Sequence, residues 1–228
     1  RPGELGARAM STARVAAFFD LDRTLLRCNS GSKWLRFLRE RGEVDAWMMA
    51  RSLLWLAKYK LAILDMERLA THLIADLRGD SEREMRDKAA IFWERDVRPA
   101  ISALALAALA EHRAQSHVVA LLSSTTQFIA EPVAAHLGIE HILCTRLHVE
   151  GGQFLGTCER PTCYGQGKVF HAERFAAAHD IDLAKSYFYT DSYSDLPMLL
   201  KVGGPRVVNP DRRLRSHARR TGWPILAW

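Results

Sequence analysis

The chain has 228 residues, of which 48% are hydrophobic and 25% are charged, as is usual for a globular protein. This length suits one sizeable domain, or one domain that carries an insertion. The formal net charge is +6, but no nucleic-acid recognition module accompanies the basic residues, so we expect no nucleic-acid partner. The arginines that crowd the last quarter of the chain resemble a solvated face: Arg206, Arg212, Arg213, Arg215, Arg219 and Arg220.

The start of the chain and its cysteines bear on the cellular setting. Residues 1–9 have no periodic pattern and Met10 is a candidate natural start, so we expect residues 1–9 to be disordered or a remnant of expression. The cysteines form no CxxC pair, and no signal peptide precedes them. We therefore expect reduced thiols in a cytoplasmic protein.

The first predicted element is a buried strand over Val15–Phe19, an apolar run that ends at Asp20-Leu21-Asp22. Two carboxylates held so close together resist ionisation, which is unfavourable for stability. The arrangement makes sense if a cation lies between them, or if one carboxylate attacks a substrate while the other moves a proton.

A helical pattern follows from about Gly31 to Arg95. This block is too long for one crossover connection, so we interpret residues 29–98 as a helical cap inserted after the first strand. Its segment Ala46–Ala57 is almost wholly apolar but too short to span a membrane. A core helix of the cap is the plainer interpretation, and a helix lying on a membrane surface is the alternative.

Strands return after the cap and alternate with helices. We predict strands at 118–122, 142–144, 187–189 and 206–208, helices at about 125–137 and 168–179, and a hairpin of 147–149 with 153–155. Alternation of this kind indicates βαβ units and a mostly parallel sheet. The expected fold is therefore α/β, with a Rossmann-like core formed by residues 10–28 and 99–228 and the helical cap inserted in it.

Polar residues follow the ends of several predicted strands. Asp20 and Asp22 follow the first, Ser123-Ser124-Thr125 the second, and Asp191 and Asp195 a later one, while Lys168 follows a Gly-Gln-Gly loop. Ligands of open parallel sheets bind at the carboxyl ends of the strands, so one crevice can collect these groups. Carboxylate oxygens suit Mg²⁺, and a lysine with a helix N-terminus suits an anion, which together indicate a phosphate ester as substrate.

These four segments resemble the four motifs of the haloacid dehalogenase superfamily of phosphohydrolases, in the subfamily IB branch that contains phosphoserine phosphatase-like enzymes. The matching stretches are Asp20–Thr24, Val119–Ser123, Gly165–Lys168 and Asp191–Asp195. The resemblance extends from about Phe18 to the C-terminus, and the helical insertion stands where that branch carries its cap.

The resemblance implies a role for each matched residue. Asp20 is expected to be the nucleophile that forms an aspartyl-phosphate, and Asp22 the general acid and base. Mg²⁺ is expected on the carboxylates of Asp20 and Asp191 and the backbone carbonyl of Asp22. The remaining expectations are phosphate binding by Ser123, Ser124 and Lys168, fixing of the turn by Thr24, and orientation of Lys168 or a metal-bound water by Asp195.

The expected function is Mg²⁺-dependent hydrolysis of a small phosphate ester, such as an amino-alcohol phosphate or a lipid phosphate. Phosphoserine fits poorly, because Asn29 stands where true phosphoserine phosphatases carry a glutamate for the substrate ammonium. Two alternatives remain open: a phosphotransferase that uses the same aspartyl-phosphate, and a non-catalytic module that docks on membrane surfaces. The sequence leaves the oligomeric state open.

Overall fold

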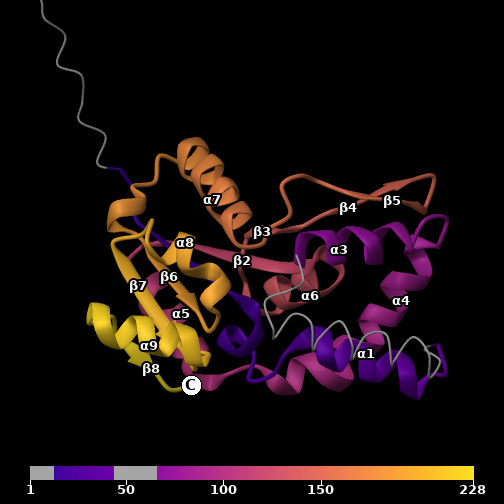
Figure 1. Ribbon diagram of the computed structural model, residues 1–228, viewed down its shortest axis with the longest axis horizontal. Coiled ribbons are helices and arrows are strands. Elements are labelled where there is room, and N and C mark those ends of the chain that lie inside the picture. Colours follow the sequence, from indigo (N-terminus) through magenta and orange to yellow (C-terminus); the bar gives the residue numbers. More distant parts are fainter. Residues whose placement is uncertain (1–12, 44–65) are drawn as a thin grey trace, which may run out of the picture.

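Figure 1 shows the computed structural model, which describes residues 13–43 and 66–228. Its centre is a parallel sheet with strand order β3-β2-β1-β6-β7-β8. The strands are β1 (Ala16–Phe19), β2 (Val118–Thr126), β3 (His141–Thr145), β6 (Tyr187–Thr190), β7 (Gly204–Val208) and β8 (Ile225–Leu226). β1 lies in the middle of the sheet and is buried on both faces, which explains its unbroken apolar sequence.

Helices cover both faces of this sheet. One face, including Phe19 and Leu121, packs against helices α5 (Ala103–Ala114) and α6 (Gln127–Leu137). The other face, including Phe18 and Phe188, packs against α7 (Gln166–His179), α8 (Leu196–Leu199) and α9 (Arg212–Thr221). The predicted α/β, Rossmann-like sheet is therefore confirmed.

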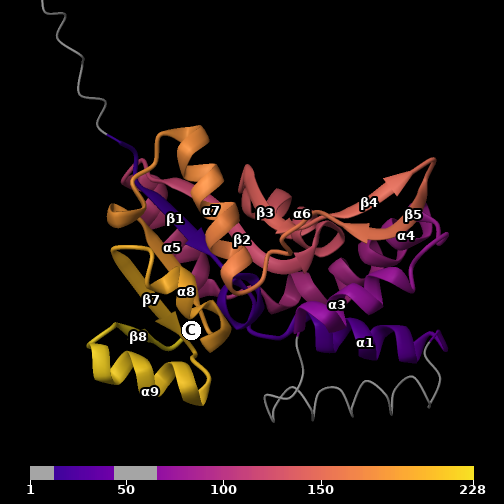
Figure 2. The same cartoon turned by 45° about the horizontal axis from the view of Figure 1, so that its top comes forward.

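The segment between β1 and β2 is helical where the structure describes it. It contains α1 (Ser30–Glu40), α3 (Met66–Ala75) and α4 (Glu82–Phe92), followed by short turns at Trp93–Val97 and Arg98–Ala100. These helices lie beside the sheet rather than on either of its faces (Figures 1 and 2). Trp34, Phe37 and Phe92 pack together and join α1 to α4. The domain boundaries at 28/29 and 98/99 stay predictions, and the Ala46–Ala57 segment and residues 1–9 lie outside the described residues.

The predicted hairpin is confirmed as β4 (Leu147–Glu150) and β5 (Gln153–Cys158), which form a separate two-stranded sheet. It begins just after β3 at the edge of the central sheet and extends from there beside the cap helices (Figure 2). The Gly79 N–H donates to the Phe154 carbonyl at 2.9 Å, and Phe154 packs edge-on against Phe128. The hairpin thus packs against α3, α4 and α6, although it follows β3 in the chain.

Two predicted boundaries were wrong at the second motif. β2 continues past Leu122 to Thr126, because Thr126 pairs with Thr145 of β3. The next helix, α6, consequently begins at Gln127 rather than at Thr125. Ser123 therefore lies near the end of a strand and not directly before a helix. In the described part of the chain, no helix is long and apolar enough to cross a membrane.

Candidate active site

Asp20 lies at the carboxyl end of the central strand. Its backbone N–H donates to the carbonyl of Tyr189 at 2.9 Å, which holds it beside the end of β6. Only 6% of the residue is exposed. The position follows from the register of the sheet, because β1 pairs with both β2 and β6. The central strand thus holds the carboxylate of Asp20 in a buried position at the end of the sheet.

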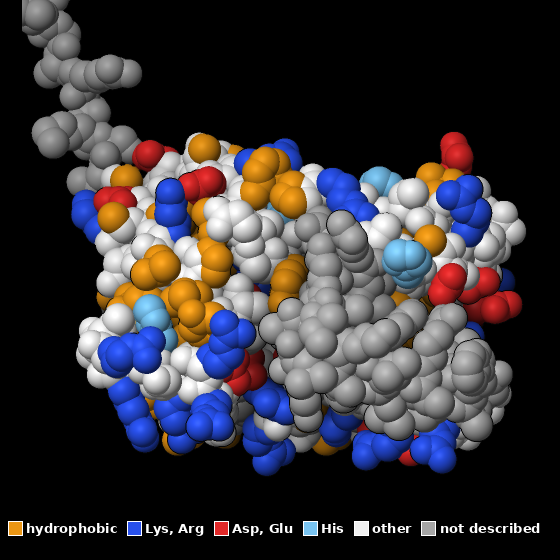
Figure 3. Space-filling model, in the orientation of Figure 1, with side chains coloured by type: hydrophobic (Ala, Val, Ile, Leu, Met, Phe, Trp, Pro, Cys, Tyr) orange, Lys and Arg blue, Asp and Glu red, His pale blue; other side chains and the backbone are white. Residues whose placement is uncertain are grey.

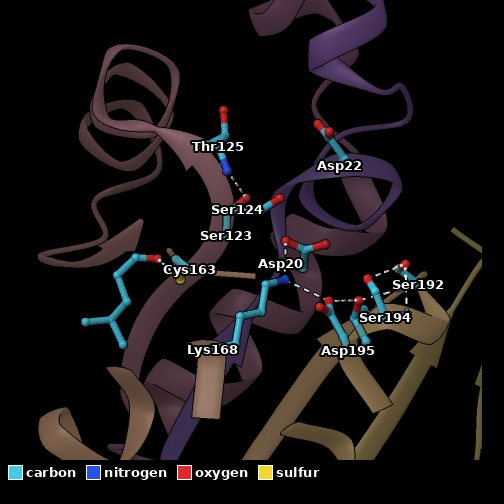
Figure 4. A network of polar contacts seen from close by, with 12 residues as sticks. Asp20, Asp22, Ser123, Ser124, Thr125, Cys163, Lys168, Ser192, Ser194 and Asp195 are labelled. Carbon is cyan, nitrogen blue, oxygen red and sulfur yellow. Dashed lines mark hydrogen bonds and ion pairs between the residues drawn. The ribbon is translucent and has the colours of Figure 1, made fainter. Parts of the chain in front are cut away.

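Lys168 lies between two carboxylates in this site (Figure 4). Its Nζ atom is 3.0 Å from Oδ1 of Asp20 and 2.7 Å from Oδ2 of Asp195. Burial alone would lower the pKa of Lys168, but the charges of Asp195 and Asp20 outweigh it and raise the pKa. The hydroxyl of Thr190 also donates to Oδ2 of Asp195, at 2.6 Å. The lysine is therefore a fixed cation beside Asp20.

Asp22 lies apart from this group, toward the cap (Figure 4). The backbone N–H of Ser30 donates to its Oδ1 at 2.8 Å, and Nδ2 of Asn29 donates to its Oδ2 at 3.0 Å. Burial raises the pKa of Asp22, while the bonds from Ser30 oppose that rise. A carboxyl group with a raised pKa is suited to proton transfer. The N-terminus of α1 thus orients the second carboxylate of the motif.

Backbone hydrogen bonds stabilise the loop of residues 21–28, which connects Asp20 to α1. The N–H of Leu26 donates to the Leu21 carbonyl at 2.9 Å, and the N–H of Arg23 to the Cys28 carbonyl at 3.0 Å. Arg23 has φ of +52°, so it adopts the left-handed conformation that non-glycine residues seldom take. Thr24 is buried, and its Oγ1 has no hydrogen-bond partner in the described part of the chain. The role of Thr24 in fixing this turn stays a prediction.

Asp191 follows β6 and is 8% exposed. Burial, and next the charge of Asp20, raise its pKa to about 8, and Arg23 offsets this only in part. Two carboxylates that resist ionising together form an oxygen donor set for a hard divalent cation. Among the described residues, no group of three or more His, Cys, Asp or Glu side chains is arranged to hold a metal ion. The residues present fit Mg²⁺, which proteins often bind through one or two carboxylates with other oxygens.

The two serines of the second motif differ in their surroundings. Ser123 is buried, and its Oγ accepts a hydrogen bond from the Thr125 N–H at 3.4 Å. Ser124 is exposed, and its backbone carbonyl accepts a hydrogen bond from the Thr145 hydroxyl at 3.1 Å. Both lie in the same view as Asp20 and Lys168 (Figure 4). Phosphate binding by either serine stays a prediction.

Several contacts that shape the site were not predicted from the sequence. Asn29 contacts Asp22, Thr190 contacts Asp195, and Nδ2 of Asn209 donates to the carbonyl of Arg23 at 3.2 Å. Asp211 accepts from the Tyr193 N–H at 2.7 Å and caps α9 through the Leu214 N–H. Asn29 and Asp211 each have a sequence signal, since asparagine and aspartate are favoured just before a helix. The contact of Asn209 joins residues that are distant in the sequence, and that of Thr190 depends on how the chain turns after β6.

Comparison with known proteins supports the family resemblance that the sequence motifs indicated. The family model of the haloacid dehalogenase-like hydrolases matches residues 17–200. The chain is similar to a probable phosphatase of Mycobacterium tuberculosis, with 34% identity over 95% of this chain and 76% of the relative. It is also similar to a histidinol-phosphatase of Neisseria meningitidis, with 31% identity over 92% of this chain and 97% of that one.

Solved structures agree with the fold. A protein of unknown function from Bordetella pertussis has a TM-score of 0.86 and 30% identity, covering 94% of this chain and 99% of its own. A substrate-bound phosphoserine phosphatase has a TM-score of 0.69 at 17% identity, covering 93% and 92% of the two chains, a likeness of fold alone. The expected family and enzyme class, a phosphatase of that family, are confirmed. The chain belongs to the haloacid dehalogenase-like hydrolases.

Proposed function

We propose that this protein is a Mg²⁺-dependent phosphomonoester hydrolase that acts through an aspartyl-phosphate on a small phosphorylated metabolite. The observation that carries the proposal is the buried Lys168, which lies within 3.0 Å of both Asp20 and Asp195. A fixed cation beside a carboxylate nucleophile offsets the repulsion that an incoming phosphate would otherwise meet. Positioning and charge neutralisation are the main demands of phosphoryl transfer.

The first half of the reaction uses both carboxylates of the first motif. A carboxylate oxygen of Asp20 attacks phosphorus, and the bond from phosphorus to the alcohol oxygen breaks. Asp22 gives its proton to that oxygen, so the product leaves as a neutral alcohol. The raised pKa of Asp22 keeps such a proton available.

In the second half, Asp22 takes a proton from a water molecule, whose oxygen attacks phosphorus. The bond between phosphorus and Asp20 breaks, which restores the carboxylate and releases inorganic phosphate. Lys168, with Ser123 and Ser124, holds the phosphoryl group. The carboxylates of Asp20 and Asp191 and the backbone carbonyl of Asp22 would hold Mg²⁺, which neutralises negative charge on the phosphoryl oxygens when bound.

We infer that the substrate is an amino-alcohol phosphate. The Neisseria relative, which is covered almost completely, is named a histidinol-phosphatase. At Asn29, where an acidic side chain would receive the ammonium of phosphoserine, the amide instead donates to Asp22. Histidinol phosphate is therefore the first compound to test, and phosphoserine is expected to be a poor substrate.

The test is phosphate release from histidinol phosphate, phosphoserine and an aryl phosphate, with Mg²⁺ and with EDTA. We expect Mg²⁺-dependent release that is fastest with histidinol phosphate. Asp20→Asn should lower the rate roughly a thousandfold or more, because the nucleophile is lost. Asp87→Asn, the same change at an exposed position of α4, serves as the matched control. Full activity in Asp20→Asn, or no release from any ester, would refute the proposal.

A further inference from the structure

A second cationic feature lies outside the site just described. A groove of about 430 Å³ runs between α9 and the turn at Tyr193–Asp195, and it is lined by Tyr193, Arg212, Arg213, Ser216 and Arg220. Lysine and arginine side chains gather over α9 at the lower left of the molecule (Figure 3). Leu214 and Ala218 form the buried side of the helix, so the arginines project from its remaining surface.

The arginines of α9 have no acidic partners among the residues that the structure describes. In the portion of the chain that is described, no carboxylate lies within salt-bridge distance of any of the five: Arg212, Arg213, Arg215, Arg219 and Arg220. Some exposed arginines elsewhere in the described chain do have acidic partners. Arg86 contacts Glu82 at 2.7 Å, and Arg98 contacts Glu94 at 2.6 Å. Helix α9 itself contains no acidic residue, so its arginines are not balanced within the helix.

The arrangement is electrostatically unfavourable for the helix itself. Arg215 and Arg219 are like charges spaced i,i+4, which repel each other on a helix surface. Arg212 and Arg213 occupy the first turn, where the positive end of the helix dipole disfavours cations. An anion bound in the groove would offset the unfavourable charge of Arg212 and Arg213 in the first turn of the helix. An ordinary solvated face gives no reason for this combination.

The lining of the groove is arranged for a compact anion. The Arg213 guanidinium stacks 4.4 Å from the centre of the Tyr193 ring, and Arg220 donates to Oγ of Ser216 at 3.0 Å. These contacts hold arginine donors along a concave surface, and guanidinium groups match phosphate geometry. The volume lies within the range of small-ligand sites.

We propose that this groove is a second anion site, which binds a small molecule that carries two or more phosphate groups. Three arginines line the groove, more charge than one phosphate would balance. The site is separate from Asp20 and Lys168 but adjoins the Asp191–Asp195 loop. The Tyr193 N–H donates to Asp211 at 2.7 Å, and the Asp211 N–H donates to the Asp191 carbonyl at 2.9 Å. The proposal goes beyond the phosphatase function and does not require it.

The test is calorimetric titration of the protein with inorganic tripolyphosphate, without Mg²⁺ and at constant ionic strength. The double variant Arg212→Gln, Arg220→Gln removes two charges from the groove. The matched control, Arg215→Gln with Arg219→Gln, removes the same charge from the same helix outside the groove. We expect the groove variant to weaken binding at least about tenfold and the control to weaken it far less.

Phosphatase activity and vesicle binding complete the test. Turnover of an aryl phosphate by the groove variant should match that of the unmodified protein, since neither arginine belongs to the catalytic machinery. Equal weakening by both double variants would overturn the proposal, because it would indicate a diffuse charge effect. Absence of tripolyphosphate binding would overturn it as well. So would flotation with phosphatidylserine vesicles in place of tripolyphosphate binding, because the partner would then be a bilayer.

Discussion

The four carboxylates of the site have different surroundings although they have the same chemistry. Asp20 and Asp195 share Lys168, whereas Asp22 accepts hydrogen bonds from the start of α1. Asp191 has neither kind of partner in the described part of the chain, and its pKa is raised to about 8. Such differences between environments allow one carboxylate to act as nucleophile while another holds a proton.

Asp191 provides a test of the metal site at the level of one residue. Asp191→Asn keeps the side-chain shape but removes a carboxyl group whose ionisation is disfavoured by burial and by Asp20. We expect the metal-free variant to be more stable by about 1 kcal/mol, because folding no longer has to keep that carboxyl group from ionising. The measurement is urea unfolding in EDTA and in Mg²⁺. The stabilisation that Mg²⁺ gives the unmodified protein should shrink or vanish in the variant. An unchanged Mg²⁺ effect would contradict the assignment of Asp191 as a ligand.

His112 predicts a dependence of stability on pH. Its Nε2 is 2.9 Å from the Tyr189 hydroxyl, and its Nδ1 is 2.8 Å from Nδ1 of His117. Burial, and next the charge of His117, lower its pKa to about 4. The unfolded chain, with an ordinary histidine pKa near 6.5, then binds more protons than the folded protein between pH 6.5 and 4. Stability is therefore complete above pH 6.5 and falls as the pH drops toward 4.

We expect this one histidine to account for a loss on the order of 2 kcal/mol across that range. The measurement is the free energy of urea unfolding at several pH values. His112→Gln should flatten the slope between pH 6.5 and 4, since glutamine cannot take up the proton. His148→Gln, at an exposed position of β4, should leave the slope as it is. Parallel slopes for all three proteins would rule out His112 as the source.

At the scale of elements, the start of α7 decides where Lys168 lies. Gly165 and Gly167 flank the first residue of this helix, and a Cβ at Gly167 would overlap the backbone carbonyl of Thr162. Glycine is therefore needed at 167 for the close approach of α7 to the preceding loop. The Gly-Gln-Gly sequence thus positions the lysine by packing rather than by contact with a ligand.

Gly167→Ala should displace the first turn of α7 and move Lys168 away from Asp20. We expect turnover to fall more than about tenfold, with a stability loss of about 1–3 kcal/mol from the overpacking. Phosphate release and urea unfolding measure the two effects. Gly31→Ala is the control, because its added Cβ would meet its nearest atom at an ordinary 3.6 Å. A Gly167→Ala protein with normal turnover would show that α7 tolerates a shift at this point.

At the scale of the whole molecule, the apolar core is divided into three clusters. Two of them cover the faces of the central sheet, and the third lies between the cap helices, α6 and the hairpin. Phe154 of β5 is 2% exposed in this third cluster. Since the clusters are separate, a cavity in the third should weaken the cap side of the molecule more than the sheet.

Phe154→Ala should destabilise its cluster by about 3 kcal/mol, because a large buried ring is lost and a cavity remains. Hydrogen exchange shows which elements lose stability. We expect lower protection in α3, β4 and β5, and unchanged protection in β1. Leu122→Ala, in a cluster on the sheet, is the matched core substitution and should lower protection of β1 and β2. Equal losses throughout the molecule in both variants would show that it unfolds as one unit.

Much of the fold could be predicted because its signals are local. The apolar run at 15–19 and the alternation of strands and helices indicated the parallel sheet, and Glu150-Gly151-Gly152 indicated the hairpin turn. Boundaries failed where pairing overrode local preference, as at Thr126, which continues β2 by pairing with Thr145. Helix α9 was missed, since its arginine-rich sequence offers few apolar residues to reveal a period.

The sequence by itself determined which candidate groups gather, because carboxylates that follow the ends of parallel strands must meet at one edge of the sheet. Only the tertiary structure decided their partners: Lys168 is shared by Asp20 and Asp195, and Asp22 is held by Asn29 and Ser30 at the start of α1. The physical reason is the distance along the chain over which each kind of signal acts. Chain-local periodicity encodes which elements form, whereas hydrogen bonds and charge pairs between distant residues depend on distances that only packing sets.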